Sequence, residues 1–163
     1  KRSIIVSLVF VFAFGSTAMA DMIPGPPGSG VKVFAPNGWK LVGAEKAGEG
    51  LLIATAPKQD CVFVWALADA ANVDKAVGVL DTILGKVVTQ AKVEKSAKIT
   101  WNNTPAIAIT GTAVAEGKPV TIALVILQPK PNKVLFTIGI VETAQKAAYK
   151  PTLDQVLAGI RPN

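Results

Sequence analysis

Residues able to act as nucleophiles or bases are scarce in this chain of 163 residues. It contains no histidine, and the only serines after residue 20 are Ser29 and Ser96. A serine hydrolase needs a nucleophile, a base and a group that orients the base, and no G-x-S-x-G motif is present. The sequence therefore gives no support to serine-type catalysis.

Cys61 is the only cysteine, and only a lysine could serve as its base. A lone cysteine can be a reactive thiol or can form an intermolecular disulfide. Cys61 opens the apolar run Cys61-Val62-Phe63-Val64-Trp65, however, where a buried thiol packs as a small hydrophobic group. We predict that Cys61 lies in the core.

Carboxylates are the remaining candidates for acid–base work, as in a paired-carboxylate hydrolase. They are Asp60, Asp69, Asp74, Asp81, Glu94, Glu116, Glu142 and Asp154. Nearly all fall at expected strand ends, turns or a helix surface, where solvation or helix capping explains them. Metal binding is left with oxygen ligands alone, and no calcium loop of the D-x-[DN]-x-[DN]-G type occurs. We predict no enzyme, with no catalytic, cofactor-binding or metal-binding residues.

Basic residues outnumber acidic ones by 17 to 11. One lysine group is formed by Lys92, Lys95 and Lys98, and a second cationic group comprises Lys130, Lys133, Lys146, Lys150 and Arg161. A positive face suits an acidic protein partner or an anionic surface, and a merely solubilising lysine surface is the alternative. Arg161 is the only arginine after residue 20, and no P-loop or G-x-G-x-x-G motif occurs, which argues against nucleic acid and nucleotides.

The three tryptophans differ in their sequence surroundings. Trp65 lies in the middle of an apolar run and is predicted to be core. Trp39 and Trp101 lie beside turns, where an indole can cover the rim of a core or line a groove. Core is the better interpretation for Trp39, whereas Trp101 follows the lysine-rich segment. Trp101, Lys92, Lys95 and Lys98 are therefore the predicted partner contacts.

Residues 1–20 have the pattern of a secretory signal peptide. Lys1 and Arg2 precede an apolar run from Ile4 to Phe14, and the small-x-small ending Ala18-Met19-Ala20 follows. The run is too short for a membrane anchor, which needs roughly 20 residues. We expect cleavage after Ala20, export to the periplasm or beyond the cell, and no transmembrane anchor afterwards. Removing Lys1 and Arg2 leaves 15 basic against 11 acidic residues, a net charge of +4.

The segment after the leader divides into an arm and one domain. Residues 21–30 contain three prolines and three glycines, which predicts a flexible arm, with a docking peptide as the alternative. Residues 31–163 are predicted to form a single domain. Strands are expected at 31–35, 39–44, 51–56, 61–68, 92–101, 105–115, 120–127 and 134–141, and helices at 72–90, capped by Asn72, and at 144–160, with Pro151 breaking the latter or starting its second half.

The hydrophobic pattern of these segments predicts an α+β fold. Residues 61–68, 120–127 and 134–141 are apolar almost without alternation, which indicates central strands covered on both faces. Residues 92–100 are mixed and lysine-rich, as is typical of an edge strand. We therefore expect an antiparallel sheet of about six strands, sandwiched between a long central helix and a C-terminal helix.

The order of elements resembles the PsbP/Mog-like superfamily of α/β sandwiches, which includes DcrB-like exported bacterial proteins. Phe34-Ala35-Pro36-Asn37-Gly38-Trp39 is similar to an F-x-P-x-G-W motif common there. Residues 134–138 resemble the last strand of the superfamily, and residues 153–160 resemble its closing helix. The resemblance spans residues 31–163 and implies a non-enzymatic accessory role. It transfers no functional residues. Photosystem members use histidines and carboxylates for metal, and this chain has no histidine. Ran-binding members use an acidic face, whereas this chain is basic after residue 20.

The sequence thus predicts an exported accessory protein that binds another exported or envelope protein or a small ligand, without a cofactor. An exported inhibitor or immunity-type protein that blocks an enzyme or toxin is the alternative. A concave pocket would favour a small ligand, whereas an exposed apolar patch would favour a protein partner.

Overall fold

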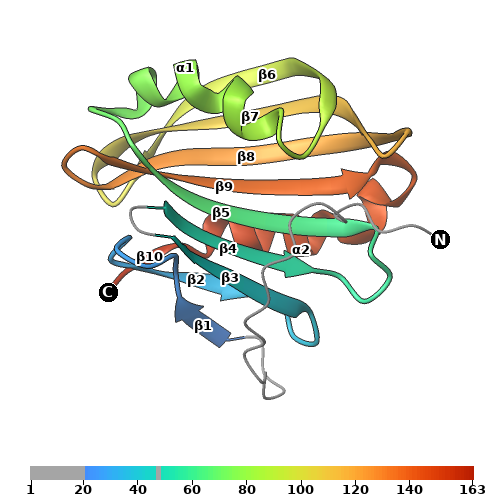
Figure 1. The fold of residues 1–163 in the computed structure, drawn as a ribbon, viewed down its shortest axis with the longest axis horizontal. Coiled ribbons are helices and arrows are strands. Elements are labelled where there is room, and N and C mark those ends of the chain that lie inside the picture. Colours follow the sequence, from blue (N-terminus) through green and yellow to red (C-terminus); the bar gives the residue numbers. More distant parts are fainter. Residues whose placement is uncertain (1–20, 47–48) are drawn as a thin grey trace.

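The computed structural model describes residues 21–46 and 49–163, and the predicted signal peptide lies outside the described residues. Within these described residues, the chain forms two antiparallel sheets and two α-helices (Figure 1). The elements are β1 (Asp21–Pro24), β2 (Val31–Ala35), β3 (Lys40–Lys46), β4 (Glu49–Thr55), β5 (Cys61–Asp69), α1 (Val73–Leu84), β6 (Thr89–Trp101), β7 (Thr104–Ala115), β8 (Lys118–Lys130), β9 (Lys133–Glu142), the 3₁₀ turn η1 (Thr143–Gln145), α2 (Lys146–Ala158) and β10 (Arg161–Pro162).

The larger sheet has seven strands in the order β3-β4-β5-β9-β8-β7-β6, one more strand than the expected six or so. The hairpin between β6 and β7 turns at Asn102 and Asn103, whose φ angles are 46° and 60°. The hairpin between β7 and β8 turns at Glu116 and Gly117, with φ of 49° and 76°. Two consecutive residues at positive φ are the signature of the type I′ turn, which matches the twist of antiparallel strands.

The central strands β5, β9 and β8 are buried on both faces, as their unbroken apolar pattern predicted. Alternate side chains of β9 enter different cores. Phe136 and Ile138 join the core beneath α1, whereas Leu135 and Val141 join the core that contains α2 residues. The two helices therefore cover opposite faces of the sheet, and Figure 1 shows α1 in front of it and α2 behind.

Helix α1 begins as predicted and ends earlier. The Asn72 side chain accepts a hydrogen bond of 2.9 Å from the Lys75 backbone N–H. The helix stops at Leu84, not near Gln90, because Gly85 caps it and β6 starts at Thr89. Its buried stripe is Val73, Ala76, Leu80 and Leu84, whereas Val77 is 41% exposed. With 12 residues it is no longer than α2, which has 13.

Helix α2 continues through Pro151 instead of breaking there. Its contact with the sheet depends on Gly139 in β9. A Cβ at that position would lie 2.6 Å from Leu153 Cδ2 and 2.9 Å from Phe63 Cε1. The missing side chain thus lets the helix approach the strand closely.

Residues 21–30 are docked on the domain, which corrects the prediction of a free arm. Strand β1 pairs with β2, with Met22 opposite Phe34, and β10 pairs with the other edge of β2. Pro26 and Ser29 are buried, and a Cβ at Gly50 would lie 2.8 Å from the Pro27 carbonyl oxygen. Backbone pairing with β2 and this close contact hold a segment whose composition alone predicts mobility.

Candidate functional site

Strand β6 is the least covered element of the large sheet. It forms the edge next to β7, and every residue from Thr89 to Thr100 is exposed. An ordinary edge strand of a sandwich has at least one face under a helix or a second sheet. The exposure pattern shows that neither face of β6 is covered in this way.

The pairing of β6 with β7 has an irregular first half and a regular second half. The register shifts between Thr89 and Lys92 and again between Val93 and Lys95. From Lys95, which pairs with Thr110, to Trp101, which pairs with Thr104, it runs without a break. The first half contains β-bulges, which twist an edge strand, whereas the second half is a straight pairing edge.

The register places the three predicted contact lysines on one strand and on two faces. Lys98 pairs with Ile107, a member of the core beneath α1. Lys95 pairs with Thr110. Side chains alternate between the two faces of a strand, and Ile109 belongs to the core beneath α1, so Thr110 lies on the opposite face, which α2 covers. Lys92 pairs with Thr112 and shares this second face. Within the described residues, none of the three lysines forms an ion pair.

Most members of the second predicted cationic group form hydrogen bonds or ion pairs with other residues of the chain. Lys130 Nζ donates to the Gly28 carbonyl at 3.0 Å, and Lys133 pairs with Asp69 at 2.5 Å. Lys150 pairs with Asp154 at 3.0 Å, and Arg161 donates to backbone carbonyls near the end of α2. Four of the five cations thus have internal partners, which leaves β6 as the better candidate for an external contact.

The tryptophans behave differently from one another. Trp65 is fully buried, and Trp39 is buried and stacks on Phe63 with ring centroids 5.3 Å apart, so both core predictions are confirmed. Trp101 is partly buried against the core that contains α2 residues, and its Nε1–H donates to the Ile160 carbonyl at 3.0 Å. Trp101 therefore ties the end of β6 to the C-terminal segment, a role that its place beside a turn did not reveal.

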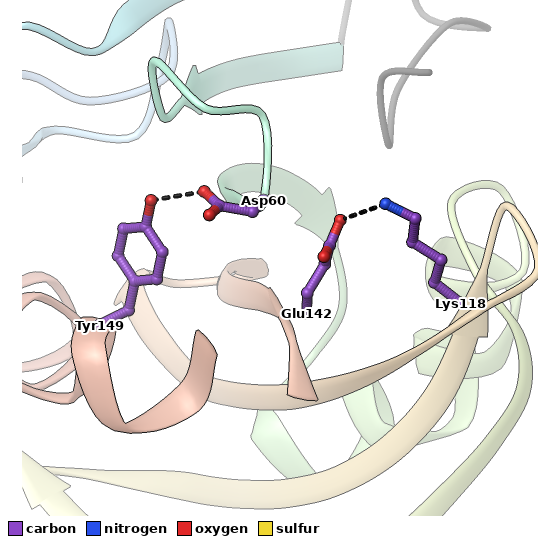
Figure 2. A network of polar contacts seen from close by, with 4 residues as sticks. All are labelled: Asp60, Lys118, Glu142 and Tyr149. Atoms are coloured by element: carbon purple, nitrogen blue, oxygen red, sulfur yellow. Dashed lines mark hydrogen bonds and ion pairs between the residues drawn. The ribbon is translucent and has the colours of Figure 1, made fainter. Parts of the chain in front are cut away.

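A second candidate region lies at the end of β5, β8 and β9. We call Asp60, Lys118, Glu142 and Tyr149 the corner cluster (Figure 2). The Tyr149 hydroxyl donates to Asp60 Oδ1 at 2.5 Å, and Lys118 Nζ bonds Glu142 Oε1 at 2.8 Å. The Glu142 backbone N–H donates to the Asp60 carbonyl at 2.9 Å, which links the two pairs. Figure 2 shows the two carboxylates turned toward different partners.

The surroundings of the corner cluster raise the pKa of two groups, Tyr149 and the adjacent Cys61. Burial, with a smaller contribution from the Asp60 charge, raises the pKa of Cys61 to about 12. Burial and the hydrogen bond to Asp60 also raise the pKa of Tyr149 well above its usual value. Both groups therefore stay protonated at neutral pH, and a protonated thiol is a poor nucleophile. Cys61 is fully buried, which confirms its predicted core position.

Two further features of the described residues bear on function. No group of three or more Cys, Asp or Glu side chains in residues 21–46 and 49–163 is arranged to hold a metal ion. None of the helices in the same part of the chain has the length and apolar character needed to cross a membrane.

Comparison with known protein families and with characterised sequences gives no match. Solved structures of other proteins share the fold, among them the following three. The solution structure of cyanobacterial PsbP (CyanoP) from Synechocystis has a TM-score of 0.63 at 10% identity, covering 94% of this chain and 99% of that one. LpqN of Mycobacterium tuberculosis, described as involved in cell envelope biogenesis, has a TM-score of 0.54 at 18% identity, covering 90% of each chain. A Pseudomonas aeruginosa protein of unknown function, PA94, has a TM-score of 0.54 at 18% identity over 71% of this chain and 84% of that one.

These likenesses confirm the fold implied by the sequence resemblance. The part of the chain that the structure describes has a PsbP-like α+β fold, with a large antiparallel sheet and two α-helices. At 10% and 18% identity they carry no functional residues over to this chain, so its site must be argued from its own side chains.

Proposed function

We propose that this chain is an exported accessory protein that works by binding another exported or envelope protein, without catalysing a reaction. The observation that carries the proposal is β6, which is exposed on both faces and bears cations that form no ion pair with any described residue. Lys92, Lys95 and Lys98 are the contact residues, and the partly buried Trp101 at the end of the strand is the fourth. Association with an acidic partner is favoured because such cations attract opposite charge at long range.

Export is supported by the leader pattern of residues 1–20 and by the envelope role stated for LpqN. The proposal that the protein is not an enzyme is supported by the corner cluster. Its two carboxylates are each engaged by a hydrogen-bond or ion-pair partner, and the thiol of the neighbouring Cys61 has a raised pKa. General acid–base catalysis needs a group that can reach substrate in the correct protonation state.

The test is a crosslinking pull-down from the protein's own envelope fraction, using the chain from residue 21 onward. The test variant reverses Lys92, Lys95 and Lys98 to Glu. The matched control reverses the exposed Lys58, Lys75 and Lys86, which gives the same net charge. We expect one stoichiometric partner with wild type and control and its loss with the β6 variant. An empty pull-down with wild type contradicts the proposed function.

Trp101 needs a gentler substitution because its indole also has a structural role. Trp101→Phe keeps an aromatic ring and removes the N–H that bonds the Ile160 carbonyl. We expect partner capture to weaken less than in the lysine variant. If Trp101→Phe abolishes capture while far-ultraviolet circular dichroism is unchanged, the indole itself is the main contact and the lysines are secondary.

A further inference from the structure

We propose that the second half of β6, residues Lys95–Trp101, accepts an acidic extended segment of the partner as an eighth strand of the large sheet. This inference rests on the proposed function and adds the mode of recognition. Strand addition uses the unpaired backbone groups of a sheet edge for affinity and the alternating side chains for specificity.

The geometry of this half-strand suits an added strand. Seven consecutive residues pair with β7 in unbroken register, and β6 is the last strand of the sheet order. A strand of five or six residues is typical of globular proteins, so the regular edge is long enough to pair with one. The β-bulges that oppose such pairing are confined to the first half, between Thr89 and Lys95.

The side chains define what the added strand must contain. Lys95 and Lys98 are three residues apart and so lie on opposite faces of the strand. A partner strand would place two carboxylates at the same spacing, one on each face. Ile99, 40% exposed and on the α2 face, lies next to Lys98 and calls for an apolar residue adjacent to one carboxylate. The recognition pattern in an antiparallel strand is therefore apolar-[DE]-x-x-[DE].

The placement of the charges favours a segment of a partner protein over a lipid surface or a second copy of this chain. A lipid headgroup surface would need the cations on one plane, whereas Lys95 and Lys98 point to the two faces of the sheet. A second copy of this chain would bring its own lysines to the shared edge, where like charges repel. Lysines on an edge strand also discourage unspecific pairing, and carboxylates at the matching positions would remove that barrier.

The experiment is a selection of nine-residue peptides from a random display library on the chain from residue 21 onward. The selected peptides are then measured against Lys95→Glu/Lys98→Glu and against the matched Lys75→Glu/Lys86→Glu control. We expect enriched peptides to carry two acidic residues three apart with an apolar neighbour. Binding should weaken about tenfold or more in the β6 variant, remain in the control and fall with salt.

Amide hydrogen exchange locates the bound peptide. We expect the selected peptide to slow exchange at Lys95–Trp101 and to leave α1 unchanged. Protection at another edge, enrichment of peptides without spaced acidic pairs, or no enrichment overturns the strand-addition proposal. The pull-down reports separately on the proposed function, because a captured partner that is indifferent to Lys95→Glu/Lys98→Glu leaves an accessory role standing while strand addition fails.

Discussion

The corner cluster and strand β6 are two charged regions of one sheet, and they treat their charges in opposite ways. In the corner, Asp60 and Glu142 are bound at 2.5 and 2.8 Å by Tyr149 and Lys118. On β6, the lysines are exposed and form no ion pair within the described residues. A satisfied polar group stabilises the fold and has little left to offer a ligand, whereas an unpaired surface cation can steer a partner. The contrast is the reason that β6, and not the corner, is proposed to bind.

The largest expected effect is on the pH dependence of the free energy of unfolding, and it tests whether Cys61, next to the corner cluster, is shielded from solvent. The unfolded chain releases the Cys61 proton near its ordinary pKa of 9.0, whereas the folded state keeps it up to about 12. Its contribution to stability is therefore complete below pH 9 and falls by about 1.4 kcal/mol per pH unit from pH 9 to 12. Guanidinium unfolding at pH 8 and 11 measures this slope, and Cys61→Ala should reduce it and leave the part due to Tyr149, whose pKa is also raised. Equal slopes for the two proteins would show that the thiol is accessible to solvent.

The next effect tests the close approach of α2 to β9. Gly139→Ala places a methyl group against Leu153 and Phe63, and we expect a loss of about 1–3 kcal/mol in the free energy of unfolding. Gly117→Ala is a control for the conformational effect of losing a glycine, because no atom lies within 4 Å of its Cβ position, although its φ of 76° adds some strain. Chemical unfolding measures both. If Gly139→Ala lowers the free energy of unfolding no more than Gly117→Ala does, α2 can move away from β9 without loss of stability.

A smaller effect measures the coupling inside the corner cluster. Tyr149→Phe removes the hydroxyl donor and Asp60→Asn removes the charge of its acceptor. We expect a coupling of about 1 kcal/mol between the two substitutions in a double-mutant cycle at pH 7. Additive effects would show that the short hydrogen bond contributes nothing to stability. The Asp60 charge would then be no better compensated than the lysines of β6.

The smallest effect is expected on β6 itself. Val93 and Ile99 are 56% and 40% exposed, so Val93→Thr and Ile99→Thr should each change the free energy of unfolding by less than about 0.5 kcal/mol. Thermal unfolding at neutral pH measures this. A larger loss would mean that these side chains pack in the free protein, and β6 would then be part of the closed structure.

Much of the fold could be predicted because its signals are local or strictly periodic. Asn72 caps α1 through a contact to a residue three positions away, and the asparagine pair at 102 and 103 supplies the positive φ of its turn. The uninterrupted apolar runs identified the central strands, because only a strand covered on both faces lacks alternation. The predicted contact lysines were brought together on β6 because they lie within seven residues of one another.

Other features could not be predicted because they depend on residues far apart in sequence. The composition of residues 21–30 favours mobility, and their docking is decided by β2 and by Gly50. The indole of Trp101 bonds a carbonyl 59 residues away, and Tyr149 reaches an aspartate 89 residues away. None of these pairings leaves a trace in a local pattern.

The sequence by itself determined most of the elements, the central strands and the charged strand, since each follows from local spacing, capping or alternation, whereas β1, β10 and the end of α1 did not follow from it. The tertiary structure alone decided which charges are compensated. Lys130 and Lys133 have partners in distant turns and strands, whereas Lys95 and Lys98 have no ion-pair partner among residues 21–46 and 49–163. Whether a charge stabilises the fold or remains available to a partner depends on what the packed chain places beside it.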